Sequence, residues 1–97
     1  MLSVREFADM VHMNAVDKGF WDRGAMIPEK LCLIHSEVSE AMEADRALEG
    51  GNFGEELADI VIRVFDLAIG CGIDIEGELE QKHFKNLNRP RLHGKRY

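Results

Sequence analysis

The chain has 97 residues, of which 45% are hydrophobic and 31% are charged, and its formal net charge is −6. This length fits a single domain, and the composition is that of a folded protein rather than a disordered one. The negative charge argues against a nucleic-acid partner, which needs a basic face, but it leaves a nucleotide ligand open because a bound cation can reverse the local charge.

The N-terminal segment MLSVREFADM carries early acidic residues and no long apolar core, so it does not look like a signal peptide. It instead predicts the start of a helix, because Ser3 can cap that helix and Glu6 completes a capping box. This first helix is expected to end near Lys18, since Gly19 is a typical helix-stop residue. The segment 19–28 that follows is a predicted loop with two aromatic residues.

Three further helices are expected from about Pro28 to Leu48, from about Phe53 to Ile69, and from Asp74, as a cap, to about Leu87. The tail at 88–97 is basic and predicted to be irregular. No alternating pattern of the kind that marks strands is present. Because the loops are short, we expect an all-α fold, an antiparallel helical bundle of about four helices in one domain, 1–97.

The two cysteines, Cys32 and Cys71, lie in apolar runs and are spaced for neither a zinc site nor a disulfide framework. Buried, reduced thiols are therefore expected, which favours a cytoplasmic location. No apolar run approaches the roughly 20 residues that span a bilayer, so no membrane association is expected.

The third predicted helix combines an acidic stripe with an otherwise apolar surface. With Glu56 placed at 0°, Asp59, Arg63, Asp66 and Glu55 fall within an arc of roughly 100°. Almost every other position is apolar, so we expect this helix to be buried nearly all round. A polar stripe is usually solvated, and this helix alone leaves a solvated face and a functional face equally open.

A second acidic pair lies on the helix before it. Glu37 and Glu40 are bordered by apolar or small residues, apart from the main apolar seam of that helix, which consists of Leu31, Ile34, Val38 and Met42. The pairs Glu37–Glu40 and Glu56–Asp59 stand on opposite sides of the turn EGGN. If the two helices are antiparallel, the four carboxylates can meet across the groove between them.

Four converging carboxylates repel one another unless some are protonated or a cation is bound. Ligands that are all oxygen suit Mg²⁺, with Mn²⁺ as a substitute, rather than zinc or copper. A di-iron site is the main alternative and needs Glu-x-x-His on two helices. The only such spacing is Glu80-x-x-His83, apart from the four acids.

These acids carry a resemblance to a known family. EVSE at 37–40 and EELAD at 55–59 match Glu-x-x-Glu followed by Glu-x-x-Asp, the hallmark of the MazG-like all-α nucleoside triphosphate pyrophosphohydrolases. The segment from Asn14 to Asp22 and the C-terminal stretch KHFKNLNRPRLHGKRY are also similar to that family. The resemblance covers most of the chain, and the two acidic motifs with the C-terminal pattern carry it.

The resemblance implies cleavage of an NTP or dNTP to the monophosphate and pyrophosphate, with Mg²⁺ held by Glu37, Glu40, Glu56 and Asp59. One of these four would be the general base that accepts a proton from water, and Glu37 or Glu40 is favoured on resemblance alone. It also implies a homodimer or homotetramer, which agrees with the excess apolar surface expected on the third helix. We therefore expect the bundle to be completed by homo-oligomerisation.

Candidate phosphate and sugar ligands lie near the C-terminus. Lys82 and Asn86 are one helical turn apart and could contact a phosphate and the sugar, or could lie where the helix frays into solvent. Lys95, in the HGK segment, is a further candidate phosphate ligand.

For each of the remaining candidates, a purely structural role is an alternative to ligand binding. Trp21 could stack on a nucleobase or pack against the first helix. Asn14 could bond a base edge or simply be exposed. Arg63 is expected to pair with Asp59 or Asp66, and otherwise to reach a phosphate.

Two other functions stay open. One is a relative with a narrower substrate, such as dCTP, dUTP or phosphoribosyl-ATP. The other is a non-catalytic helical module for nucleotide binding or assembly that keeps the same scaffold.

Overall fold

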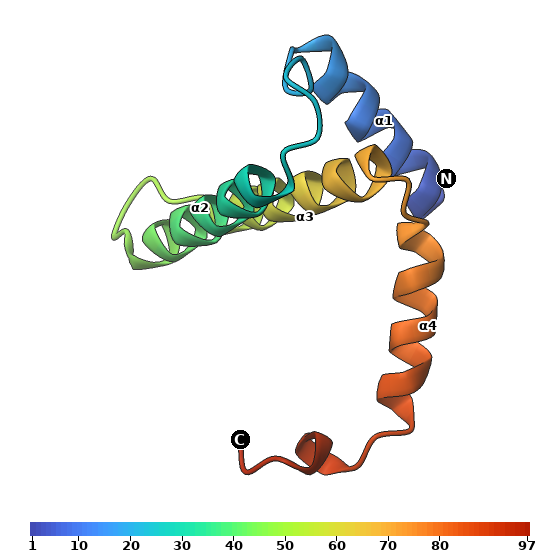
Figure 1. The fold of residues 1–97 in the computed structure, drawn as a ribbon. Helices are drawn as coiled ribbons and strands as arrows, with labels where there is room; N and C mark the ends of the chain where they lie inside the picture. Colours follow the sequence, from blue (N-terminus) through green and yellow to red (C-terminus); the bar gives the residue numbers. More distant parts are fainter.

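The computed structural model describes all 97 residues and contains no strand. Its elements, in chain order, are α1 (Val4–Asp17), α2 (Ile27–Arg46), α3 (Phe53–Gly70), α4 (Ile75–Leu87) and a short 3₁₀ helix, η1 (Arg91–Gly94) (Figure 1). The all-α prediction is confirmed. None of the helices combines the length and the apolar character that crossing a membrane requires.

Local signals in the sequence set the helix ends. The Ser3 hydroxyl accepts from the backbone N–H of Glu6, whose carboxylate accepts from the backbone N–H of Ser3, so the predicted capping box is present. Asn52 and Asp74 cap α3 and α4 through their side chains. α2 has no side-chain cap and begins with Pro28 in its first turn. It ends two residues earlier than expected.

The body of the molecule consists of α1, α2 and α3. α2 and α3 lie side by side and antiparallel, and α1 crosses the C-terminal half of α3 (Figure 1). At this crossing the Phe7 and Phe65 rings meet edge to face, with centroids 6.3 Å apart. The antiparallel prediction therefore holds for α2 and α3.

α4 does not join this body along its length. It contacts the body near its first turn, where the backbone N–H of Arg5 donates to Glu76 Oε1 at 3.4 Å. Beyond that turn the helix runs away from α2 and α3 (Figure 1), and Leu79, Phe84 and Leu87 are 48%, 70% and 66% exposed. Of the predicted bundle of about four antiparallel helices, the single chain thus forms four helices, but α4 does not lie alongside the other three, and its apolar side chains are left uncovered.

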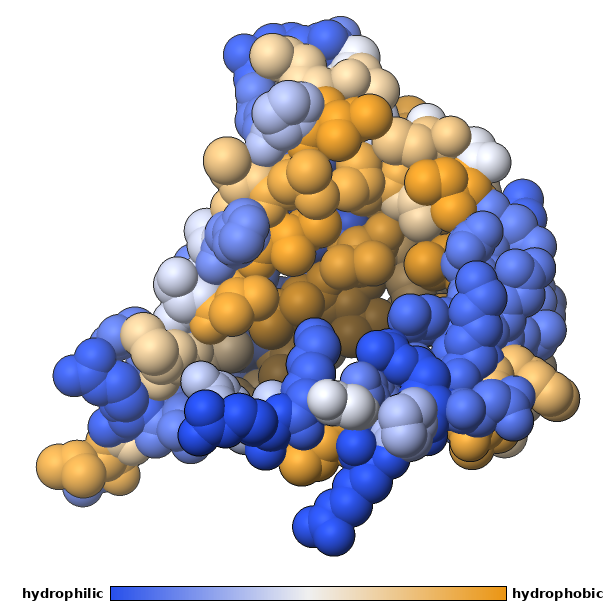
Figure 2. All heavy atoms as spheres, turned by 60° about the horizontal axis from the view of Figure 1, so that its bottom comes forward, coloured by the Kyte–Doolittle hydropathy of each residue, from blue (hydrophilic) through white to orange (hydrophobic).

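Few residues of the body are fully buried. Only 5 of the 97 residues are buried, and besides three alanines they are Lys30 and Glu37. Of the predicted apolar seam of α2, Leu31, Val38 and Met42 are about half exposed and Ile34 is half-buried, whereas Glu37 is buried. Figure 2 shows hydrophobic residues gathered over a broad, hollowed face of the molecule.

Two burial predictions are wrong for the single chain. α3 is not buried all round, because Leu57 and Val61, one turn apart, are 44% and 46% exposed on an uncovered side of the helix, and Ile62 is 38% exposed. Cys32 is exposed and Cys71 is half-buried, although both are free thiols as expected. Cys32 belongs to the outward side of α2, which explains its exposure.

The dimensions agree with an open chain. The radius of gyration is 15.8 Å, whereas a compact domain of this length has about 13 Å. The accessible surface is 7645 Å², whereas about 5600 Å² is expected for a folded monomer of this size. The chain thus exposes about 2000 Å² more than a closed monomer would.

Gly70 allows the closest packing in the body. A Cβ at this position would lie 2.2 Å from Cη2 of Trp21. We expect Gly70→Ala to lower the free energy of unfolding by about 1–3 kcal/mol, because the indole must shift. Chemical denaturation measures this change.

Gly54→Ala is the matched control on the same helix. Its new Cβ would meet nothing nearer than Asn52 Oδ1 at 3.7 Å, so the gain in helix propensity, up to about 1 kcal/mol, should prevail. If the two variants were equally stable, the packing of Trp21 on Gly70 would be disproved.

Candidate functional site

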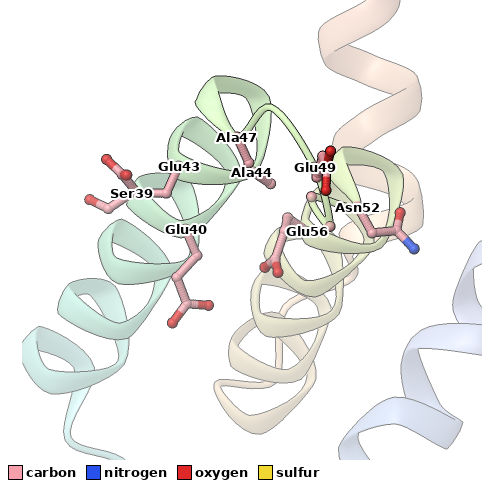
Figure 3. A pocket seen from close by; sticks show the side chains of 10 residues that line it. Ser39, Glu40, Glu43, Ala44, Ala47, Glu49, Asn52 and Glu56 are labelled. Carbon is pink, nitrogen blue, oxygen red and sulfur yellow. The ribbon is translucent and has the colours of Figure 1, made fainter.

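The groove between α2 and α3 gathers the acidic residues. α2 contributes Glu37 and Glu40, and α3 contributes Glu56 and Asp59. One carboxylate oxygen each from Glu37, Glu56 and Asp59 lie within 4.8 Å of one another. Figure 3 shows Glu40 and Glu56 pointing into the space between the two helices. The convergence expected from the two motifs is therefore present, with Glu40 beside the other three.

Glu37 is the most buried of these acids, and it has a positive partner. Its side chain is 10% exposed, and Oε1 accepts a hydrogen bond of 2.6 Å from Nε of Arg63, which is 31% exposed. The expected pairing of Arg63 with Asp59 or Asp66 is thus wrong. A buried carboxylate needs a counter-charge more than a solvated one does, and Asp66 is already bonded to His12 and Trp21.

Glu40 and Glu56 both have raised pKa values. A hydrogen bond to Glu37 is the main factor that raises the pKa of Glu40, and the charges of Glu37, Glu56 and Asp59 add to it. Removal of water raises the pKa of Glu56, and the charges of Asp59, Glu37 and Glu55 act in the same direction. In both cases the protein disfavours the ionised form.

Glu56 also carries an orphaned atom. Its Oε2 is buried and has no hydrogen-bond partner. A buried oxygen without a donor costs stability, and a divalent cation among Glu37, Glu56 and Asp59 would supply the missing partner. Carboxylate oxygens are the ligands that Mg²⁺ and Mn²⁺ prefer, so the residues present fit such an ion.

A cavity of about 270 Å³ adjoins the acids. α1 and the loop after it provide one part of its lining, and α2 and α3 provide the other. The lining residues are Val11, Asn14, Ala15, Phe20, Glu37, Glu40, Asp59, Ile62, Arg63 and Asp66. Asn14 and Arg63, two of the substrate-binding candidates, therefore share one cavity with three of the four acids. The cavity combines charged groups with an apolar and aromatic surface.

A second cavity, of about 440 Å³, lies at the turn between α2 and α3 (Figure 3). Glu40, Glu43, Glu49 and Glu56 are among its lining residues. Glu40 lines both cavities, so it stands at the boundary between them. Asn14, Arg63 and the aromatic surface belong only to the smaller one, which makes that cavity the better candidate for an organic ligand.

Trp21 is held within the chain. Its indole N–H donates to Asp66 Oδ1 at 2.8 Å, and Asp66 also contacts His12 Nδ1 at 2.8 Å. Nζ of Lys30 lies 4.1 Å from the centroid of the Trp21 ring, a cation–π contact. The ring also meets His12 of α1 edge to face, with centroids 5.1 Å apart, and it lies against Gly70 of α3, so the predicted packing against the first helix is present.

Phe20 is the aromatic residue that the sequence reasoning missed. Its side chain is 55% exposed and it lines the smaller cavity, while its backbone carbonyl accepts from Nζ of the buried Lys30 at 2.6 Å. The only signal in the sequence was its place beside Trp21 in KGFWD. Neighbouring loop residues point in different directions, and composition does not tell which one faces a ligand.

The C-terminal candidates do not reach the acids within one chain. Lys82, Asn86 and Lys95 line neither cavity, because α4 runs away from the groove (Figure 1). Asn86 is nevertheless only partly exposed, and its Oδ1 is buried without a partner.

Comparison of the chain with known protein families, with characterised proteins and with solved structures gives no match.

The pH dependence of stability tests whether the pKa of Glu56 is raised in the folded protein. Because its pKa is raised above the ordinary 4.5 in the folded state, the folded state binds the proton more tightly. Its contribution favours folding at low pH and is lost as the pH rises through the raised pKa. Without divalent ions, we therefore expect Glu56→Gln to melt a few degrees higher than the wild type at pH 8, and the difference to shrink toward pH 4.

Thermal melting in the presence of a chelator measures this difference. Glu43→Gln, an exposed acid on α2, is the control and should not show it. A Glu56→Gln variant that melts below the wild type at pH 8 would show that Glu56 is stabilising rather than strained.

Proposed function

We propose that the protein is a Mg²⁺-dependent nucleoside triphosphate pyrophosphohydrolase of the MazG-like kind, acting in the cytoplasm. The observation that carries the proposal is the convergence of Glu37, Glu56 and Asp59 within 4.8 Å, with an orphaned buried oxygen, beside a cavity with an aromatic lining. A polyphosphate that chelates a cation would fit the acidic side of the cavity, and a nucleoside would fit its apolar and aromatic side.

The acids would have distinct roles. Glu37, Glu56 and Asp59 would hold the cation, which supplies charge neutralisation of the phosphates and a water of lowered pKa when it is bound. Glu40 is the best candidate for the general base. It has no basic partner, its pKa is raised, and a carboxylate with a raised pKa accepts a proton more readily.

The nucleoside would contact α1 and the loop after it. The exposed ring of Phe20 can stack on a base, and Asn14 can donate to or accept from a base edge. Trp21 and Lys30 would act indirectly, because their contacts hold the backbone of Phe20 in place.

The active unit would contain at least two copies of the chain. The excess of about 2000 Å² per chain corresponds to about 4000 Å² for two chains, within the range that obligate dimers bury. The outward apolar seam of α2, the uncovered side of α3 and the apolar side chains of α4 would form the interface.

A second copy would also supply the missing cations. In one chain the only basic residue that lines either cavity is Arg63, and it is already paired. α4 and the tail carry Lys82, Lys95 and other basic residues away from their own acids (Figure 1). Opposite charges then favour the C-terminal half of α4 and the tail of one copy lying near the acidic groove of another, where Lys82, Asn86 and Lys95 would contact the phosphates of the bound nucleotide.

Pyrophosphate release from a panel of NTPs and dNTPs with Mg²⁺ tests the activity. We expect turnover of at least one substrate, with a loss of at least about 100-fold in kcat for Asp59→Asn, since a charged metal ligand is removed. Glu43→Gln is the control and should keep the wild-type rate.

The pattern over the panel separates the alternatives. Turnover of a single nucleotide, such as dCTP, dUTP or phosphoribosyl-ATP, would indicate the narrow-specificity relative. A folded protein that binds nucleotides but hydrolyses none of them would be the non-catalytic module, and the proposed activity would be wrong.

Phe20→Ala should raise KM about tenfold with little change in kcat, because stacking is worth about 1–3 kcal/mol per base. Phe20→Tyr, which keeps the ring, should restore the wild-type KM. Steady-state kinetics on the preferred nucleotide measure both values. An unchanged KM in Phe20→Ala would remove Phe20 from the site.

Sedimentation and subunit mixing test the assembly. The wild type should sediment as a dimer or tetramer at micromolar concentration. Lys82→Ala and Asp59→Asn should each be inactive, and after unfolding and refolding together they should regain about a quarter of the wild-type activity, as expected for sites shared between two subunits in a dimer. A monomer, or a mixture without any regain, would contradict the shared site.

A further inference from the structure

The ion pair between Glu37 and Arg63 raises a question about any cation that binds here. The Glu37 carboxylate is nine-tenths buried and is a member of the three-acid cluster, yet it already has a positive partner at 2.6 Å. A divalent ion at the cluster would place two further positive charges beside the guanidinium. The cation and the guanidinium would compete for this carboxylate, because like charges a few ångströms apart repel each other.

Arg63 has the means to move. It is anchored through Nε alone, and no other hydrogen bond from its guanidinium is present in the chain. It is 31% exposed and lines the smaller cavity together with Glu40, Asp59 and Asp66. A guanidinium has five N–H donors and suits phosphate oxygens in a two-pronged geometry, so it can change partners without leaving the cavity.

We propose that Arg63 is an exchangeable counter-ion: it neutralises Glu37 while no cation is bound, and it is displaced by the cation to bind the polyphosphate of the ligand. This inference rests on the proposed function. It adds that binding of the cation and binding of the polyphosphate are coupled through Arg63. The pair keeps a buried carboxylate neutralised in the empty protein. The incoming cation releases Arg63, and the released charge favours the anion that accompanies the cation.

The proposal predicts effects of opposite sign for two probes. For Mn²⁺ alone, Arg63→Gln should bind at least about tenfold more tightly than the wild type, because a competing positive charge is gone. For tripolyphosphate in the presence of saturating Mn²⁺, the same variant should bind about tenfold more weakly, because a phosphate ligand is gone. Isothermal titration calorimetry measures both.

Two variants serve as controls. Arg63→Lys keeps the charge but not the planar fork, so its affinity for Mn²⁺ should stay near that of the wild type. Arg46→Gln removes an exposed arginine that pairs with Glu43 at 3.3 Å, and it should change neither affinity. If Arg63→Gln binds Mn²⁺ equally or more weakly, Arg63 only orients Glu37, and the exchange is disproved. Equal or tighter binding of tripolyphosphate by Arg63→Gln would disprove the transfer of Arg63 to the phosphates.

A measurement on the wild type remains decisive if Arg63→Gln fails to fold, since that variant leaves Glu37 buried without a partner. In ¹⁵N NMR spectra, the Nε–H signal of Arg63, assigned by its absence in Arg63→Lys, should exchange slowly with water in the metal-free protein. Saturating Mg²⁺ should shift it and speed its exchange, and a chelator should reverse the change. A signal unaffected by Mg²⁺ would overturn the exchange even though the ion binds. A wild type that binds neither Mg²⁺ nor Mn²⁺ would instead refute the proposed function and the exchange together.

Discussion

The structure depends on one constraint, which is that acidic side chains, one of them buried, gather in the groove between two antiparallel helices. Burial of Glu37 between α2 and α3 is tolerated because Arg63 neutralises it at 2.6 Å. Glu40 and Glu56 have no such partner, and both are held with raised pKa values. An apolar groove would be more stable, so the acids are a cost to folding that a bound cation would offset.

The same constraint explains the exposed apolar side chains. On α2 the buried face carries Glu37, and the adjacent face with Leu31, Val38 and Met42 is left about half exposed. The uncovered side of α3 and the divergence of α4 extend this apolar surface. The acidic groove and the apolar exterior are therefore two sides of one arrangement, and the proposed site and the proposed subunit interface would depend on each other.

Much of the fold could be predicted from the sequence, because helix ends are set by local chemistry. The helix caps contact backbone groups only a few residues away, as Ser3, Glu6, Asn52 and Asp74 do. A single sequence is therefore enough to predict where these helices begin. The convergence of the two acidic pairs followed from their spacing about a short turn. The course of α4 could not be predicted in the same way, because the direction of a helix depends on what its apolar side chains pack against.

The details of the site were less predictable for a related reason. Helical spacing placed Arg63 near Asp59 and Asp66, but the pairing with Glu37 depends on burial, which only the packed structure determines. Likewise Phe20 and Trp21 are adjacent aromatic residues, and the sequence does not show which ring faces the cavity. The hydrogen bonds of Trp21 to Asp66 and of Lys30 to the Phe20 carbonyl determine this.

The most direct measurement is a crystal structure of the protein grown with Mn²⁺, with anomalous scattering used to locate the ion. We expect an anomalous peak within bonding distance of carboxylate oxygens from Glu37, Glu56 and Asp59. Density that leaves these three carboxylates without an ion at saturating Mn²⁺, with Glu37 still paired to Arg63, would contradict it.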